Sequence, residues 1–146
     1  MKVMVVGPVG MGKTSLILAL QKAGGVVRKT QDICFVGGAI DTPGEYAQIP
    51  RFYSALTVTA MEAAVIVMVK DAIDPAMTIP PGFVQMFAKP VIGVVTKIDL
   101  PHANVKRAEA ELRQAGVGLP IFMVSATTGE GIDKLYQFLV ERGCCI

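Results

Sequence analysis

Apolar and amphipathic segments alternate along the whole chain. Short runs rich in Val, Ile and Ala predict buried strands, and longer segments with apolar residues at helical spacing predict helices. The expected strands are 3–6, 33–36, 39–41, 64–69, 91–96 and 121–124. The expected helices are 13–23, 51–63, 103–115 and 132–142, the first of them ended by Gly24 and Gly25.

This alternation predicts an α/β fold. Strands that are apolar on both faces and separated by helices are typical of a parallel sheet covered on both sides. We therefore expect a three-layer α/β/α sandwich with a mostly parallel sheet of about six strands, of which 33–36 and 39–41 form a hairpin around Gly37 and Gly38. The length of 146 residues suits one domain, residues 1–146. Ligands of such folds bind at the carboxyl ends of the strands.

Composition narrows the classes of function. Hydrophobic residues make up 52% of the chain and charged residues 18%, which excludes a disordered protein. The formal net charge of +2 gives no electrostatic reason to expect nucleic-acid binding. Mean hydropathy is high at +0.52, but the longest apolar run, Ala63 to Val69, is far too short for a transmembrane helix. The N-terminus does not resemble a signal peptide, and we expect a cytoplasmic protein.

The first chemical motif lies between the first strand and the first helix. The sequence Gly7-Pro8-Val9-Gly10-Met11-Gly12-Lys13-Thr14 matches G-x-x-x-x-G-K-[ST], the phosphate-binding P-loop. Glycines let the backbone N–H groups surround phosphate oxygens, and the helix N-terminus adds a favourable dipole. Lys13 is expected at the β- and γ-phosphates and the Thr14 hydroxyl on Mg²⁺. The residues expected to contact nucleotide here are Val9, Gly10, Met11, Gly12, Lys13, Thr14 and Ser15.

Three further residues are candidates for the γ-phosphate and its metal ion. Asp41 ends a strand and is a candidate Mg²⁺ ligand, and the N–H of Gly44 in Asp41-Thr42-Pro43-Gly44 is a candidate γ-phosphate donor. Alone, such a sequence is an ordinary turn. Its place after a strand and a P-loop favours the functional interpretation. Thr30 is a candidate second Mg²⁺ ligand that senses the γ-phosphate.

Two later strand ends carry candidate base contacts. The sequence Thr96-Lys97-Ile98-Asp99 follows a buried strand. A carboxylate at Asp99 can accept from N1–H and the exocyclic amino group of guanine, which adenine cannot offer in that arrangement, while the stem of Lys97 lies along the base. After the last strand, backbone N–H groups of Ser125-Ala126-Thr127 are candidate donors to guanine O6.

In this order, these elements resemble the Ras-like small GTPases over nearly the whole chain. A closer resemblance is to the bacterial EutP/PduV family of ethanolamine- and propanediol-utilisation proteins. It is carried by Gly7–Gly10, Lys29–Gln31, Ile40–Tyr46, Arg51–Leu56, Pro80–Phe83 and Lys89–Leu100, with the strings Asp-Thr-Pro-Gly-Glu-Tyr and Arg-Phe-Tyr-Ser-Ala-Leu the most specific. The resemblance implies a P-loop GTPase-type fold and association with bacterial microcompartment metabolism.

Several residues depart from the Ras-like pattern. Glu45 stands where many such enzymes have the Gln that orients water, and Val9 replaces a Gly that leaves room for an arginine finger. Thr96 replaces the more usual Asn and Thr127 the more usual Lys. These differences predict slow hydrolysis and looser guanine binding.

Three hypotheses follow for function. The first is a Mg²⁺-dependent GTP/GDP-binding protein with slow hydrolysis, in which Lys13, Thr30 and Gly44 act on the γ-phosphate. The second, implied by the family resemblance, is an acetate kinase-type phosphotransferase using ATP. The third is a non-catalytic docking module whose partner or shell surface is the apolar segment Met77–Phe87, although packing of this segment onto the sheet is favoured over docking. Cys144 and Cys145 are expected on a frayed tail.

Overall fold

A parallel sheet forms the centre of the computed structural model, which describes residues 2–29, 39–42, 44–118 and 120–144. Within these ranges the sheet has five strands in the order β2-β1-β3-β4-β5, and every pair is parallel. The strands are β1 (Lys2–Val6), β2 (Ala39–Asp41), β3 (Ala63–Asp71), β4 (Val91–Thr96) and β5 (Ile121–Met123). The expected strand 33–36 and its hairpin turn lie outside the described residues.

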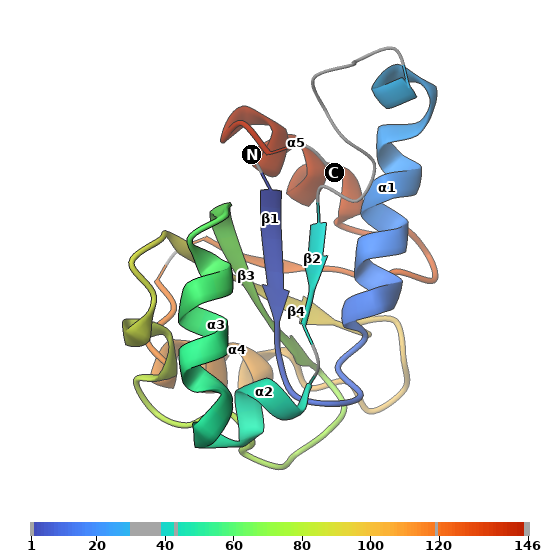
Figure 1. The fold of residues 1–146 in the computed structure, drawn as a ribbon. Helices are drawn as coiled ribbons and strands as arrows, with labels where there is room; N and C mark the ends of the chain where they lie inside the picture. The colour runs from blue at the N-terminus through green and yellow to red at the C-terminus, as the bar shows by residue number, and fades with distance from the viewer. Residues whose placement is uncertain (1, 30–38, 43, 119, 145–146) are drawn as a thin grey trace.

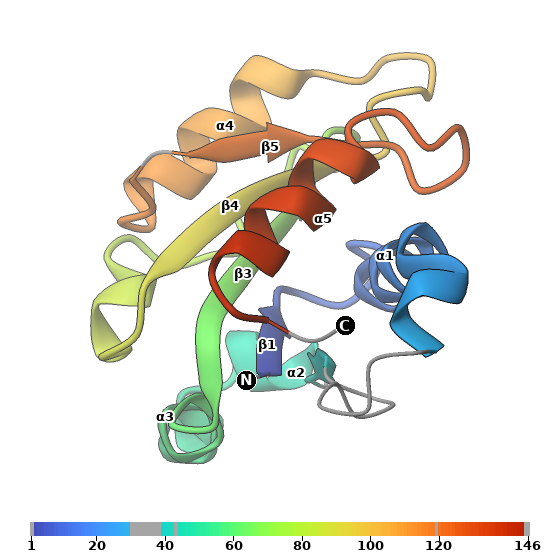
Figure 2. The ribbon, with the colours of Figure 1, turned by 90° about the horizontal axis from the view of Figure 1, so that it is seen from above.

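Helices cover both faces of the sheet, as Figures 1 and 2 show. They are α1 (Lys13–Lys29), α2 (Glu45–Gln48), α3 (Tyr53–Ala60), α4 (Val105–Gln114) and α5 (Ile132–Glu141), with short 3₁₀ turns η1 (Pro50–Phe52) and η2 (Phe83–Met86). On one face α3, α4 and η2 bury residues with Met4 and Ile66, and on the other α1 and α5 bury residues with Val5 and Val67. The three-layer prediction is confirmed.

The strands have apolar residues on both faces because both faces are covered. All residues of β3 except Ala64 are buried, and β4 is buried from Ile92 to Thr96. The predicted limits of β4 agree with the structure. The predicted end of the first helix at Gly24 was wrong, since α1 continues to Lys29. Glycine lowers helix propensity by about 1 kcal/mol but does not forbid the helix.

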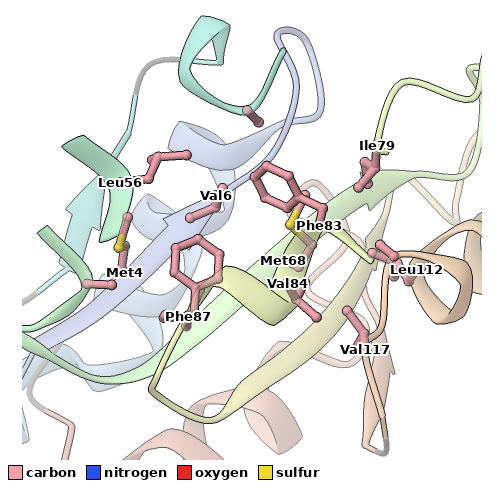
Figure 3. Close-up of a cluster of buried hydrophobic side chains, with 14 of the residues drawn as sticks. Met4, Val6, Leu56, Met68, Ile79, Phe83, Val84, Phe87, Leu112 and Val117 are labelled. Atoms are coloured by element: carbon pink, nitrogen blue, oxygen red, sulfur yellow. The ribbon is translucent and has the colours of Figure 1, made fainter. Parts of the chain in front are cut away.

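The apolar segment Met77–Phe87 contributes four buried side chains to the core. Ile79, Phe83, Val84 and Phe87 are buried, with Phe83 only 4% exposed. Figure 3 shows these side chains among residues of β1, β3 and α4. The ring of Phe83 also makes edge-to-face contacts with two other aromatic rings, at centroid distances of 5.3 and 5.9 Å. Packing onto the sheet, the favoured alternative, is confirmed for these four residues. Met77 is 58% exposed, so a partner surface at the start of the segment stays a prediction.

The structure contradicts the expectation of a frayed tail for one of the two C-terminal cysteines. Cys144 is buried against the α1 and α5 face, which contradicts the expected frayed tail at this residue. Burial raises the pKa of its thiol, because the thiolate is poorly solvated there. Cys145 lies outside the described residues.

Candidate functional site

The P-loop connects β1 directly to α1 at the carboxyl end of the sheet (Figure 1). Gly10 and Gly12 have φ angles of 83° and 85°, in the left-handed region that favours glycine. Lys13 opens α1 and is only 7% exposed, and its Nζ donates to the carbonyl oxygen of Pro8 at 3.0 Å. The lysine ammonium is thus held inside the loop that we expect to surround phosphates.

Residues at the ends of β3 and β4 hold the middle of this loop. The Thr96 hydroxyl donates to the Met11 carbonyl oxygen at 2.7 Å, and Lys97 Nζ donates to the Gly10 carbonyl oxygen at 2.8 Å. The N–H of Asp71 donates to the Met11 sulfur at 3.2 Å. Although Thr96 stands in place of the more usual Asn, its hydroxyl thus ties the strand to the P-loop.

A cavity lies on the side of the P-loop that faces β2. Its volume is about 410 Å³, and it is lined by Val9, Gly10, Lys13, Thr14, Asp41, Thr42 and Gly44. The Thr14 hydroxyl donates to Asp41 Oδ2 at 2.6 Å, which brings the two predicted metal ligands together. Thr30, the third predicted ligand, lies outside the described residues.

Gly44 packs tightly against the P-loop. A Cβ at this position would lie 2.5 Å from the backbone nitrogen of Val9, so a side chain does not fit without a backbone shift. Val9 itself is 56% exposed at the mouth of the cavity. The turn after β2 is therefore in direct contact with the loop at the position where Val9 replaces the more usual glycine.

A second cavity lies on the opposite side of the P-loop, between the loops that follow β4 and β5. Its volume is about 170 Å³, and it is lined by Gly12, Ser15, Thr96, Lys97, Asp99, Leu100, Ala126 and Thr127. The structure thus brings the predicted base-contacting residues together, with Ser125 as an exception. Ser125 is buried, its N–H donates to the Glu130 carbonyl and its Oγ accepts from the Thr128 N–H, so it shapes the loop from within.

Asp71 is part of the site and was not predicted from the sequence. It is the last residue of β3 and is 4% exposed, and its Oδ2 lies 3.3 Å from Lys97 Nζ. Lys97 has a φ of 61°, which is uncommon for a residue with a side chain. The available signal was the charged pair Lys70-Asp71, which directly follows the apolar run that ends at Val69. Thr42 and Leu100, which line the two cavities, were also missed.

Among the residues that the structure describes, no helix has the length and apolar character to cross a membrane.

Comparisons with known proteins find similar sequences along nearly the whole chain. A family model described as ethanolamine utilisation – propanediol utilisation matches residues 1–141. The chain is 39% identical to propanediol utilization protein PduV of Citrobacter freundii, over 99% of this chain and 97% of that protein. It is 36% identical to a protein of Escherichia coli (strain K12) named probable acetate kinase EutP, over 93% of this chain and 87% of that protein.

A solved structure shows the same fold. Translation elongation factor SelB from Methanococcus maripaludis superimposes with a TM-score of 0.63 at 20% sequence identity. The match covers 97% of this chain and 33% of that one, so the chain corresponds to about a third of the elongation factor. This likeness shows the fold alone.

Proposed function

The chain belongs to the ethanolamine utilisation – propanediol utilisation family, and we propose that it is a Mg²⁺-dependent GTP-binding protein with slow GTP hydrolysis in that metabolism. The observation that carries the proposal is the pair of cavities on either side of the P-loop. One contains Lys13, Thr14 and Asp41, and the other contains Lys97 and Asp99. A nucleotide that lies across Gly12 would place its phosphates in the first and its base in the second.

The phosphate side suits a magnesium nucleotide. Lys13 would supply positive charge at the β- and γ-phosphates, and the P-loop backbone would supply N–H donors. The Thr14 hydroxyl and the Asp41 carboxylate, 2.6 Å apart, are oxygen ligands of the kind Mg²⁺ takes together with phosphate oxygens and water. Bound Mg²⁺ would neutralise charge on the transferring phosphoryl group. Thr30 stays a proposed additional ligand.

The base side favours guanine. Asp99 lines the base cavity together with Thr96 and Lys97, and its carboxylate can accept two N–H bonds from the edge of guanine. Adenine presents an acceptor at N1, so it would leave the carboxylate facing a lone pair. Ala126 and Thr127 close the opposite side of the same cavity.

Hydrolysis is proposed to be slow because two positions on the γ-phosphate side, Val9 and Glu45, depart from the Ras-like pattern. Val9 occupies the space that an arginine finger from a partner would need, and Gly44 is packed against it. Glu45 follows at the position where Gln often orients the attacking water. Catalysis would then rest on positioning and charge stabilisation by the P-loop, Lys13 and the magnesium ion, without a covalent intermediate. Association with a microcompartment is part of the proposal and is supported by the family only.

A second candidate comes from the names of relatives. Proteins of Escherichia coli and Salmonella typhimurium that are 36% identical to this chain are named probable acetate kinases. The same P-loop would then hold ATP or ADP and transfer phosphate between acetate and nucleotide. The carboxylate of Asp99 in the base cavity favours guanine and ranks this candidate second.

One set of measurements on a purified sample separates the two. Titration with GTP, GDP, ATP and ADP in the presence and absence of Mg²⁺ should show Mg²⁺-dependent binding of the guanine nucleotides. Lys13→Ala should abolish this binding, whereas the exposed Lys106→Ala on α4 should not. Preferred binding of ATP together with formation of acetyl phosphate from acetate would support the kinase and overturn the GTP proposal.

Asp99→Asn gives the sharpest test of base recognition. The amide exchanges an acceptor for a donor, so the variant should prefer xanthine over guanine nucleotides. This gain of binding cannot arise from simple loss of folding. Retention of the guanine preference by the variant would refute base recognition through Asp99.

A further inference from the structure

We propose that Asp71 is a positioning residue of the nucleotide site, which acts by fixing the side chain of Lys97 across the P-loop. The inference rests on the proposed function and adds a residue to the base side of the site. It concerns how long a nucleotide stays bound and does not give Asp71 a contact with the nucleotide itself.

The two carboxylate oxygens of Asp71 have separate partners. Oδ1 accepts from the N–H groups of Ile73 at 3.3 Å and Asp74 at 2.9 Å, which caps the loop that follows β3. Oδ2 contacts Lys97 Nζ at 3.3 Å. Asp71 lies opposite Thr96 in the β3–β4 register. Its carboxylate is therefore close to the end of β4, which Lys97 directly follows. The Asp71 side chain therefore links the loop after β3 to Lys97 in the base cavity.

The ammonium group of Lys97 is held by the protein on two sides. Nζ donates to the Gly10 carbonyl oxygen at 2.8 Å and is paired with Asp71. These contacts direct the charge to the P-loop backbone and leave the four-carbon stem along the cavity wall. A bound purine would stack on the Lys97 stem, which fixes the orientation of its ring. The Asp99 carboxylate would accept hydrogen bonds from the edge of the same ring.

Loss of the Asp71 contact would free one side of the ammonium. The Lys97 ammonium would then keep only its hydrogen bond to the neutral Gly10 carbonyl oxygen. A carbonyl holds an ammonium less strongly than a carboxylate does. Lys97 would sample more rotamers, the stem would cover the base for a smaller part of the time, and the nucleotide would leave faster. The Asp71–Lys97 pair is partly solvent-exposed at Lys97, so we expect a moderate effect.

Asp71→Asn isolates this contact. The amide oxygen retains an acceptor for the loop N–H groups, whereas the amide nitrogen replaces Oδ2 and faces Lys97 Nζ donor to donor. The matched control is Asp74→Asn in the same loop, whose carboxylate accepts from the Ala76 N–H. Both variants lose one negative charge within three residues of each other.

The experiment measures release of a fluorescent GDP analogue in the presence of Mg²⁺, after mixing with excess unlabelled GDP in a stopped-flow instrument. Asp71→Asn should release the analogue about three- to tenfold faster than the natural protein. Asp74→Asn should release it at the natural rate. In a Lys97→Met background, which keeps an unbranched stem without the charge, Asp71→Asn should change release by less than about twofold.

Equal acceleration by Asp71→Asn in both backgrounds would overturn the inference, because Asp71 would then act without Lys97. Unchanged release in the natural background would overturn it as well. In either case the natural protein still binds guanine nucleotide and the proposed function stands. If the natural protein binds no guanine nucleotide, the proposed function fails and this inference fails with it.

Discussion

The buried ion pair Lys70–Glu111 is predicted to contribute strongly to the free energy of unfolding, and its burial gives the size of the effect. Lys70 on β3 and Glu111 on α4 are each 1% exposed, with Nζ 3.3 Å from Oε1. Lys70 Nζ also donates to the Ala76 carbonyl, and Glu111 Oε2 accepts from the N–H groups of Thr78 and Ile79 at 2.9 and 3.0 Å. The pair thus fastens the loop after β3 to helix α4.

The magnitude follows from burial. Removal of one partner leaves the other charge without compensation in the interior, which costs about 3–5 kcal/mol. Such a loss is a large part of the roughly 5–15 kcal/mol by which domains are stable. Lys70→Met and Glu111→Gln should each show a loss of this size. The double variant removes both charges, fills similar volume and keeps an amide oxygen for the loop N–H groups, so it should lie within about 2 kcal/mol of the natural protein.

Urea unfolding followed by far-ultraviolet circular dichroism measures these differences, since the chain has no tryptophan to report by fluorescence. Nucleotide is left out, because ligand that binds the folded state would add its own stabilisation. With a typical urea dependence of about 2 kcal/mol per molar, each single variant should shift the midpoint by roughly 2 M.

The control is an exposed pair on the same helix. Arg113 Nη2 lies 3.0 Å from Glu109 Oε1 one turn away, with side chains 54% and 27% exposed. Removal of this pair through Arg113→Met and Glu109→Gln should cost less than about 0.5 kcal/mol. If the Lys70→Met/Glu111→Gln double variant loses the sum of its single losses, or the surface pair costs as much as the buried one, the reasoning from burial is refuted.

Three further predictions follow from single contacts. Gly44→Ala places a Cβ 2.5 Å from the Val9 nitrogen and should weaken nucleotide binding at least about tenfold by calorimetric titration; unchanged affinity would contradict the close approach. Thr96→Val removes the 2.7 Å bond to the Met11 carbonyl and should raise Kd about fivefold, with recovery in Thr96→Ser. Phe83→Ser should lower the free energy of unfolding by roughly 3–5 kcal/mol, and a near-natural urea midpoint would argue against its core position.

Much of the fold could be predicted because each layer leaves a local pattern. Strands with two covered faces are apolar throughout, and the limits of β4 came directly from such a run. The P-loop was also predictable, since its eight residues are contiguous and lie between a strand and a helix. The stop signal of Gly24 and Gly25 failed, because glycine weakens a helix without necessarily ending it, and α1 continues through both residues.

Burial of individual side chains was harder to predict. The segment from Met77 to Phe87 has no clear periodicity, so its apolar residues fitted both a core and an exposed surface. The structure shows that Ile79 and Phe83 fill the space between the sheet and its helices, which only the arrangement of α3 and α4 decides. Likewise, Ser125 was a candidate base contact because it follows the last strand, whereas its N–H and its hydroxyl both form hydrogen bonds inside the loop.

The end of β3 shows why charged residues at a strand end can mislead. Lys70 and Asp71 are consecutive, so their side chains point to opposite faces of the sheet. Lys70 meets Glu111 on the α4 side, and Asp71 meets Lys97 on the P-loop side. Each charge has its partner in a distant part of the chain: Glu111 is 41 residues after Lys70, and Lys97 is 26 residues after Asp71. Because the partners differ, the first pair is expected to govern the urea midpoint and the second the release of nucleotide, so the two roles can be measured separately on adjacent residues.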